Sequence, residues 1–272
     1  METKGWFPFP GTQLHAIDLG WTHNEIQAFA NQSHSLLEFA DNLFQKQMME
    51  DHASVWVEKT PSNSYCFRQF LHLDPTNKVI LCVRNPKDTI ASLVNRGMSE
   101  FFATVLWVYN IQSALALRES PRFFLVKYED LVKFPEETLS GVCRFIGVDF
   151  HKQLPSHHIE KKDLYSKLST WQNDPGDTIK ASPSTFANLP ERQQARVIAA
   201  MNFVRVFSGS QHTDERAEYN CIDVAELLSY ETSDISSSGY SFLYPQMIGD
   251  WTKRLLLGYS TKLSGYPARI RS

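Results

Sequence analysis

The stretch that decides the fold spans residues 77–94 and reads NKVILCVRNPKDTIASLV. Residues 79–83 form a short apolar run rich in β-branched side chains, which is typical of a parallel strand covered on both faces. Pro86 suits the first position of a helix, and Asn85 before it is a favourable N-cap. The stretch therefore predicts a buried strand that ends at Arg84 and turns at once into a helix.

The same stretch has the layout of an anion site. Ser92 follows Arg84 by eight residues, which is about two helical turns. A guanidinium at a strand end, a helix N-terminus and a hydroxyl on that helix can converge on one phosphate. The alternative is a surface Arg–Asp pair at the start of the helix, with a serine that faces solvent.

Three segments carry a resemblance to a known family. Residues 84–92, RNPKDTIAS, resemble the 3'-phosphate-binding segment of sulfotransferases that use 3'-phosphoadenosine-5'-phosphosulfate (PAPS). Residues 57–63, VEKTPSN, resemble the Lys-Thr-Pro element of bacterial and carbohydrate-directed members, and residues 123–131, FFLVKYEDL, resemble the strand and acidic turn that follow. In that family the arginine and the serine hold the 3'-phosphate, so the resemblance implies Arg84 and Ser92 as cofactor-binding residues.

The resemblance implies an α/β fold with a parallel sheet flanked by helices, sulfotransferase-like and related to the P-loop NTPases. Alternating helical and strand patterns over about 100 residues agree with it. It also implies transfer of a sulfuryl group from PAPS, the co-substrate, to a hydroxyl or amine of a carbohydrate or small metabolite, without a metal. Tyr165 and Trp171 are candidates to stack on the adenine.

Lys59 is the predicted catalytic residue, because it matches the lysine of the Lys-Thr-Pro element. A cation there could steady the leaving or the transferring group. Two alternatives stay open: Lys59 forms a surface salt bridge with Glu58 or another acid, or Glu58 is itself a base. Adjacent residues of an extended segment point to opposite faces, so both cannot serve one pocket.

The family's 5'-phosphosulfate loop, in which Lys or Arg precedes Ser-Gly-Thr, is not found around any of the 12 glycines. Residues 10–12, Pro-Gly-Thr, come nearest and lack the cation. The chain is therefore expected to lack the first βα unit, and an exposed sheet edge would favour association with another chain. This leaves an alternative function, a non-catalytic, truncated or degenerate sulfotransferase-like protein that binds a nucleotide or a partner. A third hypothesis is that the chain is a relative of the P-loop kinases. The missing Gly-x-x-x-x-Gly-Lys-Ser/Thr motif disfavours it.

The length and composition of the chain limit its size class and its partners. The chain has 272 residues, 42% of them hydrophobic, and a net charge of −3, so a full core is expected and nucleic-acid binding is not. No secretory signal and no apolar run of about 18 residues is found, which predicts a cytoplasmic protein without a membrane span. Two domains are predicted: residues 1–210 form the sulfotransferase-like α/β domain, and residues 211–272 form an extension with a polar linker and a short amphipathic helix.

Overall fold

The structure is a computed structural model that describes residues 20–59, 61–156, 179, 181–209, 216–233, 235, 245 and 248–249. The chain divides into two compact units. Residues 20–59 are the described part of the smaller unit, and the other described residues belong to the larger one. Several sequence predictions lie outside the described residues, namely the Pro-Gly-Thr stretch at 10–12, Tyr165, Trp171 and the amphipathic helix of the extension.

The smaller unit contains a pair of helices, α2 (His23–Gln32) and α3 (Leu36–Glu50). A capping box starts α2, because the backbone N–H of Glu25 donates to the Thr22 hydroxyl at 3.3 Å and the Glu25 carboxylate accepts from the Thr22 N–H at 2.7 Å. Both helices contribute to one small apolar cluster, which consists of Ile26, Ala30 and Phe39 with Trp21, Phe29 and Leu43 packed against them.

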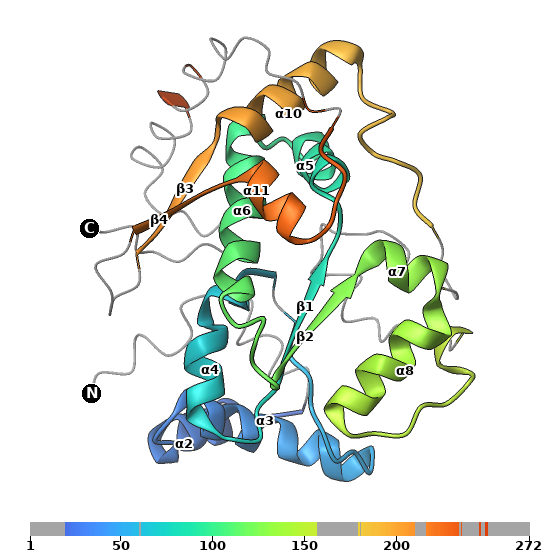
Figure 1. Cartoon of the computed structure of the whole chain (residues 1–272). Helices are drawn as coiled ribbons and strands as arrows, with labels where there is room; N and C mark the ends of the chain where they lie inside the picture. The colour runs from blue at the N-terminus through green and yellow to red at the C-terminus, as the bar shows by residue number, and fades with distance from the viewer. Residues whose placement is uncertain are drawn as a thin grey trace. The chain divides into compact units, whose positions relative to one another are not determined.

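The larger unit alternates helices and strands (Figure 1). Its elements are η1 (Pro61–Cys66), α4 (Phe67–Leu73), β1 (Val79–Val83), α5 (Pro86–Asn95), α6 (Glu100–Leu115), β2 (Phe123–Lys127), α7 (Tyr128–Lys133), α8 (Pro135–Ile146), η2 (Leu154–Ser156), α10 (Glu191–Phe203), β3 (Arg205–Gly209), β4 (Arg216–Asn220) and α11 (Cys221–Leu227). Strands β1 and β2 are parallel, in a register that runs from Val79 opposite Phe123 to Val83 opposite Lys127. The predicted α/β class, with parallel strands flanked by helices, is confirmed.

The two faces of the β1–β2 pair are covered differently. Leu81 and Leu125 lie opposite each other and face the main core. On the other face Phe124 stacks on Phe145 of α8, with ring centroids 5.1 Å apart. Cys82 of β1 also points to this second face and is exposed. The prediction of a strand covered on both faces is therefore wrong at Cys82, because α8 packs beside β2 and leaves this position of β1 open.

Helix α6 is a central element of the larger unit. Trp107 is buried, and its indole N–H donates to the backbone carbonyl of Arg84 at 3.2 Å, which ties α6 to the end of β1. Glu100 is buried at the start of α6 and pairs with Arg196 of α10 at 3.1 Å. Among the helices that the structure describes, none combines the length and hydropathy needed to cross a membrane.

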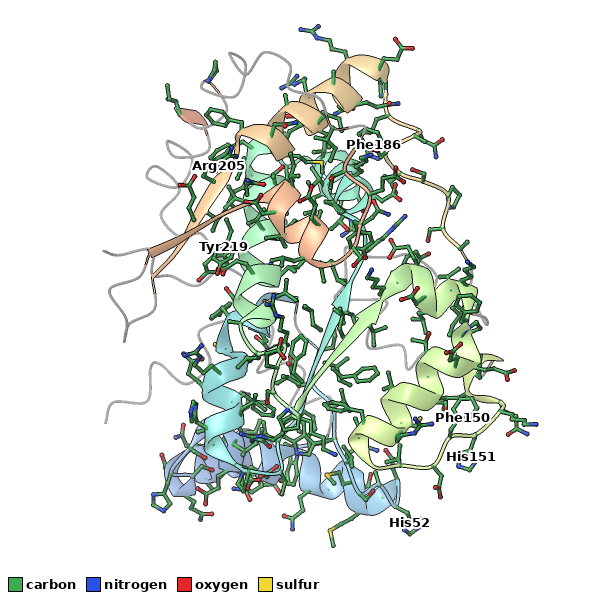
Figure 2. All side chains as sticks on the ribbon, viewed as in Figure 1. His52, Phe150, His151, Phe186, Arg205 and Tyr219 are labelled. Atoms are coloured by element: carbon green, nitrogen blue, oxygen red, sulfur yellow. The ribbon has the colours of Figure 1, made fainter. Side chains whose placement is uncertain are left out.

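The main core continues past residue 200. Strands β3 and β4 pair antiparallel, and Figure 2 labels Arg205 and Tyr219 on them. The helix that follows, α11, packs Val224 into the same core as Ile90 and Val108. The predicted domain boundary after residue 210 lies between β3 and β4 and stays a prediction.

Ile90 fixes α5 in the core, since its side chain is fully buried. Replacing Ile90 by alanine should lower the free energy of unfolding by about 2–5 kcal/mol, because a cavity opens beneath α5. Ile90→Val removes one methyl group and should cost only about 0.5–1.5 kcal/mol. Urea unfolding followed by circular dichroism measures both, and equal small losses for the two variants would contradict this packing.

Candidate functional site

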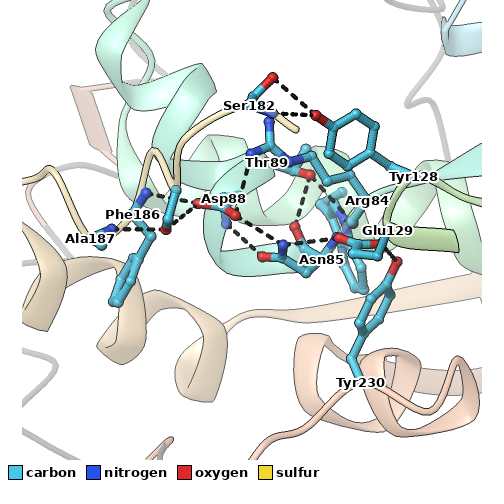
Figure 3. A network of polar contacts seen from close by, with 12 residues as sticks. Arg84, Asn85, Asp88, Thr89, Tyr128, Glu129, Ser182, Phe186, Ala187 and Tyr230 are labelled. Carbon is cyan, nitrogen blue, oxygen red and sulfur yellow. Dashed lines mark hydrogen bonds and ion pairs between the residues drawn. The ribbon is translucent and has the colours of Figure 1, made fainter. Parts of the chain in front are cut away.

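The candidate site lies where the two parallel strands end. Val83 and Lys127 form the last register pair, so the next residues, Arg84 and Tyr128, leave the sheet side by side. The Arg84 guanidinium carbon lies 4.8 Å from the centroid of the Tyr128 ring, within the range of a cation–π contact. The parallel register thus brings an arginine and an aromatic ring together at one edge (Figure 3).

Asn85 caps α5 and connects it to the start of α7, which follows β2. Its side-chain oxygen accepts from the Asp88 N–H at 2.9 Å, which makes it the predicted N-cap, with Pro86 at the first helical position. Its own backbone N–H and side-chain amide donate to Glu129 Oε1 at 2.9 and 3.0 Å. Internal oxygens thus accept from the Asp88 N–H of the first turn and from both Asn85 donors, and the expectation that the N-terminus of α5 faces a phosphate stays a prediction.

The Arg84 guanidinium forms an ion pair, but not all of its N–H donors have a partner among the described residues. Its Nη2 lies 3.3 Å from Asp88 Oδ2, and the two side chains are 22% and 12% exposed, so the Arg–Asp pair exists but is not a surface pair. Nε of Arg84 is buried and has no hydrogen-bond partner among the described residues. A guanidinium offers five N–H donors, and a buried unpaired donor costs about 1–3 kcal/mol. An oxyanion beside Arg84 would relieve that cost.

Asp88 connects this turn to a segment far along the chain. Its Oδ1 accepts from the Ser184 hydroxyl at 2.7 Å and from the Phe186 N–H at 2.9 Å. Tyr128 holds the same segment, because its hydroxyl oxygen accepts from the Ser182 N–H at 2.8 Å. Burial by itself would raise the pKa of Asp88, but the hydrogen bonds and the Arg84 charge outweigh it and hold that pKa below the ordinary value.

The other predicted site residues have different environments. Ser92 lies one turn beyond Asp88 on α5, is half-buried, and its hydroxyl makes no hydrogen bond within the described residues. Asp88 contacts Arg84, whereas no hydrogen bond joins Arg84 to Ser92 in the described part of the chain. Lys59 is an exposed residue of the smaller unit, and its catalytic role stays a prediction. Across the described ranges, no three His, Cys, Asp or Glu side chains are grouped to hold a metal ion.

Sequence reasoning missed three partners of the site, which are Glu129, Tyr230 and the segment at 182–186. Glu129 lies in the quoted acidic turn, and its place just after a parallel strand was the signal that could have assigned it to this edge. Tyr230 donates its hydroxyl to Glu129 Oε2 at 2.8 Å from a point 101 residues along the chain. No motif marks Tyr230 or the segment at 182–186, since both reach the site through the fold.

The turn at the carboxyl edge of β1 and β2 is the candidate site, and comparison with known proteins gives the family. Residues 5–152, more than half of the chain, match the sulfotransferase family, and the chain belongs to this family. It is 22% identical over 260 residues to the 3-beta-hydroxysteroid sulfotransferase of Cavia porcellus, covering 80% of this chain and 72% of that protein. It is 29% identical over 127 residues to the 3-alpha-hydroxysteroid sulfotransferase of the same species, covering 38% and 42%. The sulfotransferase domain from the Synechococcus PCC 7002 olefin synthase shares 20% identity, with a TM-score of 0.43 and 80% of each chain covered.

The lowered pKa of Asp88 makes its contribution to stability dependent on pH. A depressed carboxyl pKa stabilises the fold fully above the unfolded pKa of about 3.9, and this stabilisation is lost as the pH falls through the lower native pKa. At pH 7 Asp88→Asn should lower the free energy of unfolding by about 1.5–3 kcal/mol, because Arg84 loses a charged partner. The deficit should shrink as the pH falls below about 4 in urea unfolding. A deficit that stays constant with pH would show that the charge of Asp88 is not what stabilises this turn.

Proposed function

We propose that the chain transfers a sulfuryl group from PAPS to a hydroxyl, or an amine, of a carbohydrate or small metabolite. Membership of the sulfotransferase family supports sulfuryl transfer in general. The observation that supports PAPS is Arg84, whose buried Nε at the strand end has no hydrogen-bond partner among the described residues. In this proposal Arg84 and Ser92 bind the 3'-phosphate of the nucleotide.

The residues fit a phosphate group in charge and in donor type. Arginine binds phosphate oxygens through a planar fork of N–H groups, and hydrogen bonds of this kind are about twice as strong as neutral ones. The stacking on Tyr128 and the pair with Asp88 hold the guanidinium plane, so less side-chain freedom is lost on binding. Ser92, without a hydrogen bond of its own within the described residues, supplies a hydroxyl donor on the same helix.

Sulfuryl transfer breaks the bond between sulfur and the leaving phosphate oxygen and forms a bond from sulfur to the acceptor oxygen or nitrogen, whose proton passes to solvent or to a base. Catalysis of such a transfer consists mainly of positioning the reactants and stabilising charge on the leaving group. Lys59 is our candidate for the second task, because a cation can stabilise the negative charge that develops there. Both Cavia porcellus relatives are named for hydroxysteroids, so a first acceptor screen should include hydroxysteroids beside carbohydrates.

The nucleotide site is tested by calorimetric titration with 3',5'-adenosine bisphosphate, the desulfated product. The wild-type chain should bind it, and Arg84→Ala should weaken binding by about 10- to 100-fold, because a charge-assisted hydrogen bond is lost. Arg84→Lys keeps the charge without the fork and should fall between the two.

Ser92→Ala is the matched variant for this titration. Its hydroxyl makes no hydrogen bond within the described residues, so the variant should keep the wild-type melting temperature while binding the bisphosphate about fivefold more weakly. A folded wild-type chain that does not bind the bisphosphate would overturn the proposal. Binding without transfer to any acceptor would favour the non-catalytic alternative.

Lys59 is tested separately from nucleotide binding. Lys59→Ala should lower the rate of sulfuryl transfer by about 100-fold or more, since one electrostatic stabiliser of the reaction is removed. Its affinity for 3',5'-adenosine bisphosphate should change by less than about twofold, whereas Lys59→Arg should recover part of the rate. If Lys59→Ala transfers the sulfuryl group at the wild-type rate, the result would favour the alternative that Lys59 only forms a surface salt bridge.

A further inference from the structure

Both oxygens of the Glu129 carboxylate are occupied. Oε1 accepts two hydrogen bonds from Asn85, and Oε2 accepts the Tyr230 hydroxyl at 2.8 Å. Burial would raise the pKa of Glu129, but these hydrogen bonds outweigh it and lower the pKa, so the group is ionised at neutral pH. A carboxylate with both oxygens engaged holds its neighbours in place. We call this set of three residues, Asn85, Glu129 and Tyr230, the Glu129 bridge.

Tyr230 follows the C-terminal end of α11, and the backbone there is well held. Ser229 adopts a left-handed conformation with φ of 56°, which is disfavoured for residues other than glycine. The next N–H, that of Tyr230, donates back to the Ala225 carbonyl at 2.9 Å, a hydrogen bond that closes the helix end. Leu228 is buried beside them and anchors the turn in the main core. The backbone that carries Tyr230 is thus held in place by the helix end and the core.

Tyr230 contacts the strand edge in two independent ways. The Nζ of Lys127, the last residue of β2, lies 4.8 Å from the centroid of the Tyr230 ring. The hydroxyl of the same ring reaches Glu129, two residues further along (Figure 3). Burial raises the pKa of Tyr230, and the Glu129 charge adds to the shift, so the hydroxyl stays protonated and donates. The second contact reaches the turn that carries Arg84, because Glu129 also binds Asn85.

We propose that Tyr230, acting through Glu129, is a positioning residue for the phosphate-binding arginine. Asn85 follows Arg84 directly, and its backbone N–H and side-chain amide are both fixed by Glu129. If the Tyr230 hydroxyl is removed, Glu129 loses the partner that orients it, and the turn between β1 and α5 is less restrained. This inference rests on the proposed function and extends the nucleotide site to a residue beyond the 5–152 range that matches the family.

The test compares two nucleotides that differ only in the 3'-phosphate. Tyr230→Phe should bind 3',5'-adenosine bisphosphate about tenfold more weakly than wild type, because a hydrogen bond to a charged group is lost. Its affinity for adenosine 5'-monophosphate, which lacks the 3'-phosphate, should change by less than about twofold. A merely structural role for Tyr230 would weaken both nucleotides alike, and that result would overturn the proposal.

Two further variants complete the experiment. Tyr219→Phe removes the hydroxyl of a half-buried tyrosine on β4 that packs against the same core, and it should bind both nucleotides as wild type does. Glu129→Gln weakens the bridge at its centre and should show the same selective loss as Tyr230→Phe. Wild-type affinity for the bisphosphate in Tyr230→Phe would refute the inference alone, whereas no binding by the wild-type chain would refute the proposed function and this inference with it.

Discussion

The parallel pairing of β1 and β2 is the constraint on which the site depends. Because Val83 lies opposite Lys127, the residues that follow each strand leave the sheet at the same edge. The contacts of Arg84 with Tyr128 and of Asn85 with Glu129 follow from that register. A shift by one residue would move every side chain to the opposite face and separate these pairs. The register of β1 and β2 therefore determines which residues meet at the turn.

The Arg84 guanidinium pairs with Asp88 and, in the proposed function, also binds a phosphate. Asp88 keeps Arg84 in place and compensates its charge while the protein is without ligand. Such a pair costs desolvation, and its Coulombic attraction offsets that cost only in part. A phosphate that approached Arg84 would also approach Asp88, so its binding depends on the donors that Asp88 does not use. Within the part of the chain that the structure describes, Nε of Arg84 is such a donor, because it is buried and has no hydrogen-bond partner there.

The sequence allowed the local structure to be predicted well and the long-range contacts poorly. Pro86 and Asn85 place the start of α5 because their effects are local: a fixed φ angle and a cap for a free amide. Arg84 could be placed at the strand end for the same reason. Tyr230 could not be placed, since no local pattern indicates that a tyrosine will meet a carboxylate 101 residues earlier. The exposure of Cys82 was missed because the covering of a strand depends on where α8 packs.

The two oxygens of Asp88 belong to events at different stages of folding. Oδ2 pairs with Arg84 within a single helical turn, whereas Oδ1 accepts from Ser184, 96 residues further along the chain. The local pair can form as soon as α5 does, but the distant bond requires closure of a long loop, and contacts of high sequence separation slow folding. During synthesis from the N-terminus, the turn at Arg84 would emerge from the ribosome well before the segments that complete it. We therefore expect the contacts that complete the candidate site to form late in folding, although residues 84–88 are synthesised early.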